Sequence, residues 1–442
     1  MPKKLRDLIF IIFIILFTIG TIVISIYASG YKFNLSWPLK LNRLLIKTGM
    51  IAVDTLPSGA TIYLDDQPQS NFSLNPLAND YLTSAAKIKN VLPGEYTLTL
   101  KLDGYWPISK KITVYSNQTT FAEDINLFRS DQPLLIASSS KEEFKLNADF
   151  KYLFLPSAKK IITLKNGQEK IIKTNDNSGC WLANEDKLLA SGWLFNPDGI
   201  NDVNYAQIIG SNAYNWQTDE NNNRLYYQGN GSLNYLDIGS QKSTSVLTNA
   251  NCLAYEARGN SLFFIEEIKG QTTLKKYSLN AQKNEQELIL PSVGKYRFIN
   301  DDSKFISLYD DKNRTLYLIN PEQINANVKI LKNIKSWQWL NDHELFYNND
   351  LEIYRFDLNN NDNTLLTRLS EEISKINWNK SNNYLIFATA NNLNAFDLKI
   401  GIITKIFQAE EIAYPVLNNQ DDIVYFWAKI NNQSGVYSLQ LQ

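Results

Sequence analysis

Two patterns of apolar and polar residues divide the chain. An apolar stretch without charge runs from Leu8 to Ala28, and short segments of alternating apolar and polar residues follow from residue 48 to the carboxyl end. The 21 residues of the first pattern make a helix about 30 Å long, which matches the hydrocarbon core of a bilayer. Alternation with a period of two predicts strands. We therefore expect one apolar helix followed by an all-β chain.

The apolar stretch predicts a transmembrane helix over residues 8–28, preceded by a short N-terminus of residues 1–7. Tyr27 stands near its end, where interfacial aromatic residues are common. The apolar region of a secretory signal peptide is usually shorter, about 7–15 residues. Residues 28–30, Ala-Ser-Gly, nevertheless form a small-residue cleavage pattern, so a cleaved signal peptide is the alternative.

The charges around the apolar stretch predict its orientation. Lys3, Lys4 and Arg6 lie directly before it, whereas the basic residues after it are spread along the chain. A tight basic cluster favours a cytoplasmic N-terminus. We expect a single-pass protein of the cell membrane whose other domains lie outside the cytoplasm, joined to the helix by a linker over residues 29–47.

Residues 48–128 contain five or six short alternating segments. Ile51 and Val53 alternate with polar residues before a Pro-Ser-Gly turn, and Ile62 and Leu64 do so after it. Gly and Pro punctuate the other segments in the same way, as between strands. The pattern predicts a small antiparallel β-sandwich.

Three segments of this region, PSGATIYLDD, LPGEYTLTLKLDGYW and KKITVYSNQTTFAEDINL, resemble the PEGA domain. The structural signature positions are Pro57, Gly59, Ala60, Pro93, Gly94, Tyr96, Gly104 and Tyr105. Ser58 stands where the family has Glu, but this is a turn position, so the fold expectation is unchanged. The resemblance implies a small β module found in surface and envelope proteins of bacteria and archaea, often beside a membrane anchor, and it implies no catalysis.

Residues 129–442 repeat one layout in eight segments, each with a large apolar residue, a turn rich in Asn and Asp, and a short apolar strand. The apolar anchors of the strands are Leu153, Leu188, Leu225, Leu262, Phe305, Leu345, Leu385 and Ile423. Their spacing of 35 to 43 residues is typical of the blades of a β-propeller. We expect a propeller of seven or eight blades.

The two ends of the repeat region predict how the propeller closes. The last repeat stops after its third strand, and the segment PLLIASS at residues 133–139 could supply the missing outer strand. Pairing the two ends would leave no free edge. The second repeat is irregular, because NPDGINDVNY replaces a simple turn and no fourth strand is visible. The repeats resemble degenerate WD-repeat or Tol-type blades, which implies an architecture but no activity.

Few residues suit catalysis or metal binding. The chain has one histidine, His343, in a polar turn, and two cysteines, Cys180 and Cys252, which could pair or remain separate thiols. Most hydrolases and zinc sites need more imidazoles or thiolates than this. No P-loop, GxGxxG or GxSxG motif is present, and a net charge of −1 does not favour nucleic acid. We expect no catalytic residue, cofactor or metal.

Two alternatives concern acidic residues. The turn DLNNNDN at residues 357–363 offers oxygen ligands for calcium, although a hairpin with Asx turns explains the same residues. Paired acids could serve a glycosidase if two carboxyl groups met in one cleft. These pairs are Asp301-Asp302, Glu371-Glu372 and Asp421-Asp422.

Aromatic residues recur before most of the turns, and this repetition predicts packing between blades. They are Trp181, Trp216, Tyr255, Phe298, Trp339 and Trp378. Aromatic residues that break the pattern are better candidates for binding a partner. These candidates are Trp193, Trp337 and Trp427.

Together, the patterns favour a non-catalytic, membrane-anchored protein of the cell surface or envelope. Its propeller would present loops to a protein or glycan partner. One alternative is an envelope carbohydrate-active enzyme, a glycosidase or lyase, built on the propeller. Another is an assembly factor for envelope proteins, which would offer exposed strand edges to its clients.

Overall fold

A computed structural model describes residues 3–442 except 34–44, 71–80, 175–177, 184, 200, 211, 220, 222, 249–250, 292–293, 302, 419 and 421. Strands make up 55% and helices 7% of the structure that is described, which confirms the all-β prediction. The chain forms two compact units. The first is Met1–Asp131 with Lys399–Thr404 and Gln442, and the second is Gln132–Leu398 with Lys405–Leu441. Each unit is described by itself.

Helix α1 spans Lys3–Ala28 and begins before the apolar stretch does. Its segment Leu5–Ala28 has a mean hydropathy of 3.0. The hydroxyls of Thr18 and Thr21 donate to the carbonyl oxygens four residues earlier, each at 2.8 Å, so these polar groups need no water. The helix has the length and composition of a membrane anchor or of a signal sequence, and its orientation stays a prediction.

Strands β1 (Tyr31–Phe33) and β2 (Leu45–Lys47) form an antiparallel pair directly after α1. The Gly30 carbonyl oxygen accepts hydrogen bonds from the backbone N–H and the hydroxyl of Thr48, both at 2.8 Å. The segment predicted as a linker therefore contains paired strands, while its residues 34–44 lie outside the described residues.

The rest of the first unit contains two facing sheets, ordered β6-β3-β9 and β5-β4-β7-β8. The strands are β3 (Gly49–Leu56), β4 (Thr61–Leu64), β5 (Gln67–Pro68), β6 (Ala86–Val91), β7 (Gly94–Lys101), β8 (Ile108–Val114) and β9 (Thr119–Asn126). Four predicted core residues, Ile51, Val53, Ile62 and Leu64, are at most 6% exposed. The predicted alternation therefore identified the inner faces correctly.

The prediction of a wholly antiparallel sandwich is wrong at one pair, and the strands number more than five or six. Strand β9 runs parallel to β3, with Met50 opposite Thr119 and Leu56 opposite Asn126. The reason is topological. Strand β8 belongs to one sheet and β9 to the other, so the chain crosses between layers instead of turning back as a hairpin within one sheet.

Ser84 holds the turn that carries the first part of the PEGA-like signature. Gly59, at a φ of +100° that favours glycine, donates its N–H to the Ser84 carbonyl oxygen at 2.7 Å. The N–H of Ala60 donates to the Ser84 hydroxyl at 3.0 Å. Ser84 is 5% exposed and was not identified from the sequence. Pro57 completes the turn, and its carbonyl oxygen accepts from the Thr55 hydroxyl at 2.6 Å.

The other signature positions also shape the backbone. Pro93, directly before β7, and Gly94, its first residue, are exposed, and the Tyr96 hydroxyl donates to the Leu92 carbonyl oxygen at 2.8 Å. Gly104 has a φ of +79°. Tyr105 is partly buried against the sandwich core. These contacts give the signature a structural role.

Replacing Ser84 by alanine should loosen the signature turn. The substitution removes the acceptor of the buried Ala60 N–H, and an unpaired buried donor costs about 1–3 kcal/mol. Amide exchange in residues 57–62 should accelerate by roughly tenfold. Hydrogen–deuterium exchange mass spectrometry on the full-length protein measures this rate. Ser109→Ala removes an exposed hydroxyl of β8 and is the matched control. Equal exchange in both variants would contradict the role of Ser84.

The second unit contains eight four-stranded sheets among the described residues. The first sheet contains β11 (Lys145–Leu146), β12 (Tyr152–Leu155), β13 (Lys160–Thr163) and β14 (Glu169–Ile171), and the second contains β15 (Cys180–Trp181), β16 (Leu188–Ala190), β17 (Trp193–Phe195) and β18 (Val203–Asn204). The third contains β19 (Tyr214–Thr218), β20 (Arg224–Gly229), β21 (Ser232–Asp237) and β22 (Lys242–Leu247), and the fourth contains β23 (Cys252–Arg258), β24 (Ser261–Ile268), β25 (Gln271–Ser278) and β26 (Lys283–Leu290). The next three are β27 (Tyr296–Ile299), β28 (Ile306–Asp310), β29 (Thr315–Ile319) and β30 (Lys329–Leu331); β31 (Ser336–Asn341), β32 (Glu344–Asn348), β33 (Glu352–Asp357) and β34 (Asp362–Arg368); and β35 (Lys375–Asn379), β36 (Tyr384–Ala388), β37 (Asn392–Asp397) and β38 (Ile402–Gln408). The last joins β39 (Glu411–Leu417), β40 (Ile423–Ile430) and β41 (Gln433–Gln440) to β10 (Leu134–Ser138).

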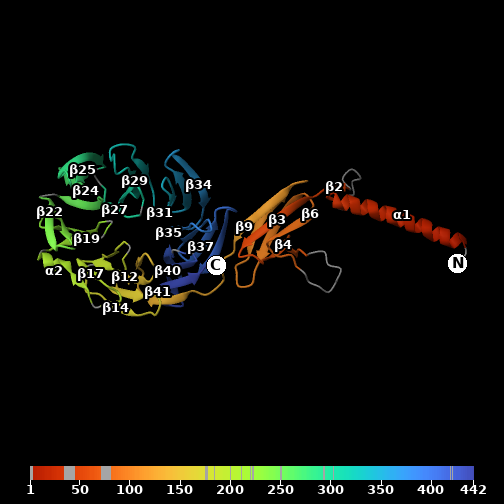
Figure 1. Ribbon diagram of the computed structural model, residues 1–442, viewed down its shortest axis with the longest axis horizontal. Helices are drawn as coiled ribbons and strands as arrows, with labels where there is room; N and C mark the ends of the chain where they lie inside the picture. Colours follow the sequence, from red (N-terminus) through yellow and green to blue (C-terminus); the bar gives the residue numbers. More distant parts are fainter. Residues whose placement is uncertain are drawn as a thin grey trace. The chain divides into compact units, whose positions relative to one another are not determined.

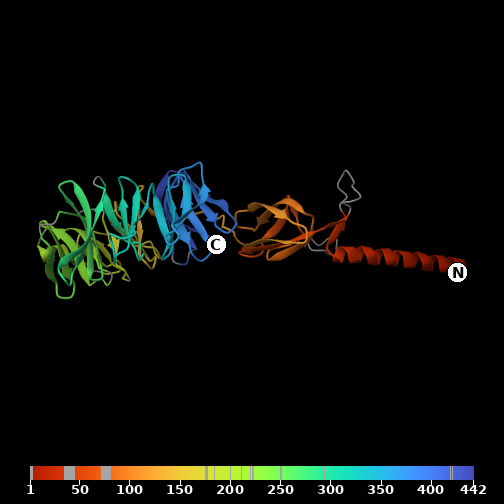
Figure 2. The same cartoon turned by 90° about the horizontal axis from the view of Figure 1, so that it is seen from above.

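These sheets follow one another around a ring in chain order (Figure 1), and Figure 2 shows the same ring from its edge. The arrangement is that of a β-propeller. The prediction of seven or eight blades stays a prediction, with the eight sheets favouring the higher number. The predicted closure is confirmed, since β10 pairs antiparallel with β41 and Leu134 lies opposite Ser438.

The repeat anchors are mostly buried in the propeller. Six of them are fully buried, namely Leu153, Leu188, Leu225, Leu262, Leu345 and Leu385. Phe305 and Ile423 are only partly buried, and the next residues, Ile306 and Val424, are fully buried instead. The predicted anchor was therefore one residue early in these two repeats, because successive residues of a strand point to opposite faces.

The second repeat differs from the others in its last strand. Its fourth strand, β18, which was not visible in the sequence pattern, is two residues long. The short helix α2 (Tyr205–Ile209) follows at once. The Asn204 side chain caps this helix by accepting the N–H of Gln207 at 3.0 Å.

Candidate functional site

The structure does not bring the three tryptophans predicted to bind a partner together. Trp193, Trp337 and Trp427 lie in β17, β31 and β40, three different sheets. Trp427 is 2% exposed, so it offers almost no surface to a ligand. Trp193 is partly buried, and its ring stacks on Phe195 with centroids 5.7 Å apart.

Trp337 serves to hold Asp301. The indole N–H groups of Trp337 and Trp339 both donate to Asp301 Oδ2 at 2.9 Å, and the Ser307 hydroxyl donates to the same oxygen at 2.6 Å. One carboxylate thus joins two neighbouring sheets, β27–β30 and β31–β34.

The other paired acids have structural partners or cannot be placed. Glu371 accepts from the Asn392 side chain at 3.1 Å, and Glu372 forms an ion pair with Lys335. Asp302 and Asp421 lie outside the described residues. The glycosidase alternative therefore gains no support from these pairs.

The recurring aromatic residues pack between neighbouring sheets, as predicted. Their ring centroids lie 5.0 to 6.1 Å apart in three such pairs, Trp181–Tyr152, Trp339–Phe305 and Trp378–Phe346.

The remaining candidates for chemistry have ordinary structural roles. Cys180 and Cys252 are free thiols in different sheets, and burial raises the pKa of Cys252 to about 12, which keeps it protonated. His343 is exposed in its turn. The Asp357 carboxylate accepts the N–H of Asn359 at 2.9 Å, as in an Asx turn. Within the described parts of the chain, no group of three or more His, Cys, Asp or Glu residues could hold a metal ion.

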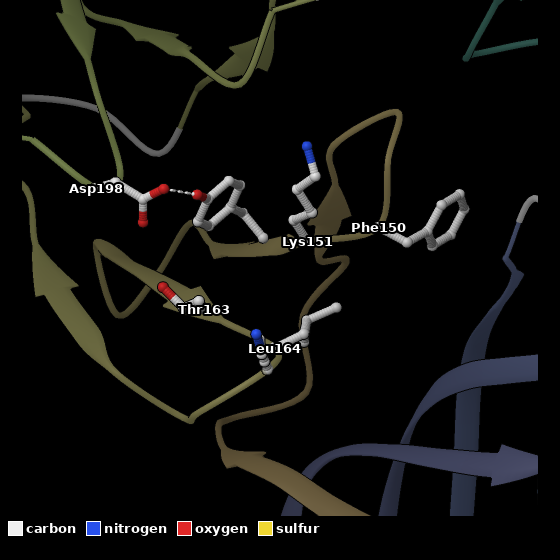
Figure 3. Close-up of a pocket in the computed structure, with 7 residues that line it drawn as sticks. Phe150, Lys151, Thr163, Leu164 and Asp198 are labelled. Atoms are coloured by element: carbon white, nitrogen blue, oxygen red, sulfur yellow. Dashed lines mark hydrogen bonds between the residues drawn. The ribbon is translucent and has the colours of Figure 1, made fainter.

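A hollow of about 490 Å³ opens beside the first sheet of the propeller. It is lined by Phe150, Lys151, Tyr152, Thr163, Leu164, Lys165 and Asp198. Figure 3 shows the Phe150 ring at one side and the Asp198 carboxylate at the other. Phe150 and Lys151 come from the β11–β12 turn and Tyr152 begins β12. Thr163 ends β13, and Leu164 and Lys165 follow it, whereas Asp198 comes from the β17–β18 loop of the next sheet. None of these residues was identified as a site from the sequence. The sequence feature that could have indicated the hollow is the irregular second repeat, which carries Asp198.

Asn147 shapes the turn that carries Phe150. Its Oδ1 accepts the N–H groups of Lys151 and Tyr152, both at 2.8 Å, and its Nδ2 donates to Asp186 Oδ1 at 2.6 Å. Asn147 is 2% exposed; its bond to the Tyr152 N–H is buried, and those to the Lys151 N–H and to Asp186 are partly buried. Phe150 takes a φ of +53°, which is rare for a bulky residue.

Lys170 holds the loop that carries Asp198. Its Nζ donates to the carbonyl oxygens of Asn196 and Gly199 at 2.7 and 3.0 Å and to Asp202 Oδ1 at 2.7 Å. The side chains of Lys170 and Asp202 are about three-quarters buried, at 24% and 23% exposure. The irregular segment is therefore anchored to the neighbouring β14.

The Tyr152 hydroxyl donates to Asp198 Oδ2 across the two sheets. Burial, together with the hydrogen bond and charge of Asp198, raises the pKa of Tyr152 to about 12. Tyr152 is therefore protonated at neutral pH, and it acts as a hydrogen-bond donor that fixes Asp198 at the rim of the hollow.

The cations of the hollow differ in their surroundings. Lys151 Nζ lies 2.9 Å from carboxylate oxygens of both Asp149 and Asp186, so two acids offset its charge. Lys165 is exposed and has no ion pair among the described residues. The hollow thus combines an apolar wall of Phe150 and Leu164 with one carboxylate and one available ammonium group.

A second hollow, of about 420 Å³, lies at the ends of β31, β35 and β39. Its amides are used to join sheets, because Gln338 Oε1 accepts the N–H of Trp378 at 2.6 Å and Asn377 Nδ2 donates to the Pro415 carbonyl oxygen at 2.6 Å. The first hollow is therefore the better candidate for a ligand.

Residues 81–126 match the family model of the PEGA domain, which confirms the resemblance seen in the sequence. No curated protein matches the chain. Similar solved structures include Hsv2 of Kluyveromyces lactis (11% identity, TM-score 0.35, 49% of this chain and 70% of that one). An oligogalacturonate lyase of Vibrio parahaemolyticus is 12% identical with a TM-score of 0.38, over 69% and 92% of the two chains. A eukaryotic initiation factor is 10% identical with a TM-score of 0.47, over 71% and 94%.

Proposed function

We propose that this protein is a non-catalytic, membrane-anchored component of the cell envelope that presents its propeller to a protein or glycan partner. In this proposal α1 is retained as the anchor, with its N-terminus in the cytoplasm. The PEGA domain follows it in the chain, outside the cytoplasm, and the propeller carries the recognition surface.

The observation that carries the proposal is the irregular second repeat. Regular repeats of a propeller satisfy the packing between blades, whereas the segment from Asn196 to Asp202 departs from the repeat and is held in place by Lys170. This irregular segment places Asp198 at the hollow. Packing between blades does not explain a carboxylate at that position. Departures from a local rule of this kind are typical of functional positions, and loops on a rigid scaffold commonly carry binding residues.

The protonation of Tyr152 supports a binding role for this residue over a role as general base. A general base works best with a pKa near the working pH, but the pKa of Tyr152 is raised to about 12. The hydroxyl therefore orients Asp198 and is poorly suited to abstracting a proton from a substrate.

Affinity capture tests the proposal. The full-length protein, held in lipid nanodiscs, is passed over a protein-rich and a glycan-rich envelope fraction of the source cell. We expect one component to be retained by the wild type and lost with Asp198→Lys, which reverses the charge at the rim, but kept with Asp342→Lys in an exposed turn of another sheet. Release of sugar fragments by the wild type alone would overturn the non-catalytic proposal in favour of a glycosidase or lyase. Capture of unfolded membrane-protein clients that is unaffected by either variant would favour an assembly factor.

A further inference from the structure

We infer that the hollow between Phe150 and Asp198 binds a neutral hexopyranose unit of a glycan. This inference rests on the proposed recognition function and names its ligand class. A pyranose presents an apolar face of C–H groups and a belt of hydroxyls that both donate and accept. The hollow offers a matching apolar wall and a matching set of acceptors and donors.

The apolar wall is built at a conformational cost. A left-handed backbone is strained for a residue with a side chain. Asn is the residue found most often at positive φ among the described propeller residues, while Phe150 is one of two aromatic residues there. The ring is partly buried and lies near Tyr425, with centroids 6.2 Å apart. The ring packs against the core that the first and last sheets share and also lines the hollow.

The polar side suits hydroxyl groups. Asp198 Oδ2 accepts from Tyr152, and its exposed carboxylate retains acceptor capacity for hydroxyl donors. Lys165, which follows the end of β13, can donate to a hydroxyl, since its ammonium group has no ion pair among the described residues. A phosphate or sulfate group fits less well, because Asp149 and Asp186 already offset Lys151 and Asp198 would repel an anion.

The size of the hollow fits a sugar unit at the surface of a longer chain. Its volume of about 490 Å³ lies within the range of roughly 300–1,000 Å³ that is common for small-ligand sites. The hollow is open, so neighbouring sugar units could extend into solvent. The same unit could come from a free polysaccharide or from a glycan attached to a protein, and the two sources need separate measurements.

Saturation-transfer NMR on the full-length protein in nanodiscs, without sugar-based detergent, tests the inference. The probes are neutral oligosaccharides built from glucose, galactose, mannose or N-acetylglucosamine. We expect transfer to the ring protons of at least one probe, and an affinity at least about tenfold weaker, a loss near 1.4 kcal/mol, in Asp198→Asn and Phe150→Asn. Asn is well tolerated in the left-handed region, so Phe150→Asn removes the aromatic part of the wall and keeps the turn. Asp342→Asn, an exposed turn residue of another sheet, should bind like the wild type.

Two results would overturn the inference: no transfer to any probe, or equal transfer in the wild type and both hollow variants. If affinity capture still retains a component that Asp198→Lys loses, the recognition function stands and only the sugar assignment falls. Binding of a free polysaccharide, or of a glycoprotein until its glycan is removed, would each support the inference and identify the source.

Discussion

Replacing Gly435 by alanine is expected to destabilise the propeller by about 1–3 kcal/mol, the usual cost of inserting a methyl group into a packed site. Strand β41 is the strand on which the ring closes, and Gly435 lies opposite Ser138 of β10. A methyl group on Gly435 would lie 2.3 Å from the Ala137 carbonyl oxygen and 2.7 Å from Leu135 Cδ1. Because a backbone atom cannot rotate away, β10 must shift, and the edges that it covers become exposed.

Denaturant unfolding of the full-length protein, followed by tryptophan fluorescence, measures this effect. Gly239→Ala is the matched control, since a methyl group there meets nothing closer than Asp237 Oδ1 at 3.7 Å and the position does not have a positive φ. We expect the control to unfold within about 0.5 kcal/mol of the wild type, as a surface substitution does. Equal midpoints for Gly435→Ala and the control would show that β10 contributes little to closure.

Replacing Asn147 by alanine is expected to cost about 2–6 kcal/mol, because one buried and one partly buried N–H group lose their acceptor at about 1–3 kcal/mol each. These are the N–H groups of Lys151 and Tyr152. The substitution also releases Asp186 from the Asn147 amide. Since the same turn carries Phe150, binding at the hollow should be lost together with stability.

The experiment combines unfolding with binding of whichever partner the wild type retains. Asn166→Ala is the control, because Asn166 also accepts one backbone N–H, that of Gln168 at 3.0 Å, but in an exposed turn. It should cost less than about 1 kcal/mol and leave binding unchanged. A stable Asn147→Ala variant that no longer binds would separate the two roles, whereas a stable variant that binds normally would show that the turn does not depend on Asn147.

The sequence was sufficient for the features that depend on local periodicity. The uncharged stretch from Leu8 to Ala28 predicted the helix, the alternation around Ile51 and Ile62 predicted the sandwich core, and the recurrence of anchors such as Leu153 and Leu188 predicted the propeller sheets. The unfinished last repeat even predicted the pairing of β10 with β41. Each of these follows from burying one face of an element at a regular spacing.

Prediction failed where two elements had to be compared in space. The parallel pairing of β3 with β9 depends on the crossing between two sheets, and no local pattern records it. Phe305 and Ile306 are both apolar, so alternation could not decide which of them is fully buried. The candidate tryptophans were chosen because they break the repeat, but Trp427 is buried and Trp337 binds Asp301.

What the sequence by itself determined is therefore the order and type of the elements: an apolar helix, a PEGA domain and a ring of repeated sheets. What only the tertiary structure decided is the hollow. Phe150 and Thr163 lie at one end of the β12–β13 hairpin. Asp198 belongs to the next sheet and joins them because the two sheets pack side by side and Lys170 holds its loop. Periodicity reflects the burial of each element by itself, whereas a site depends on contacts between elements, which a local pattern does not contain.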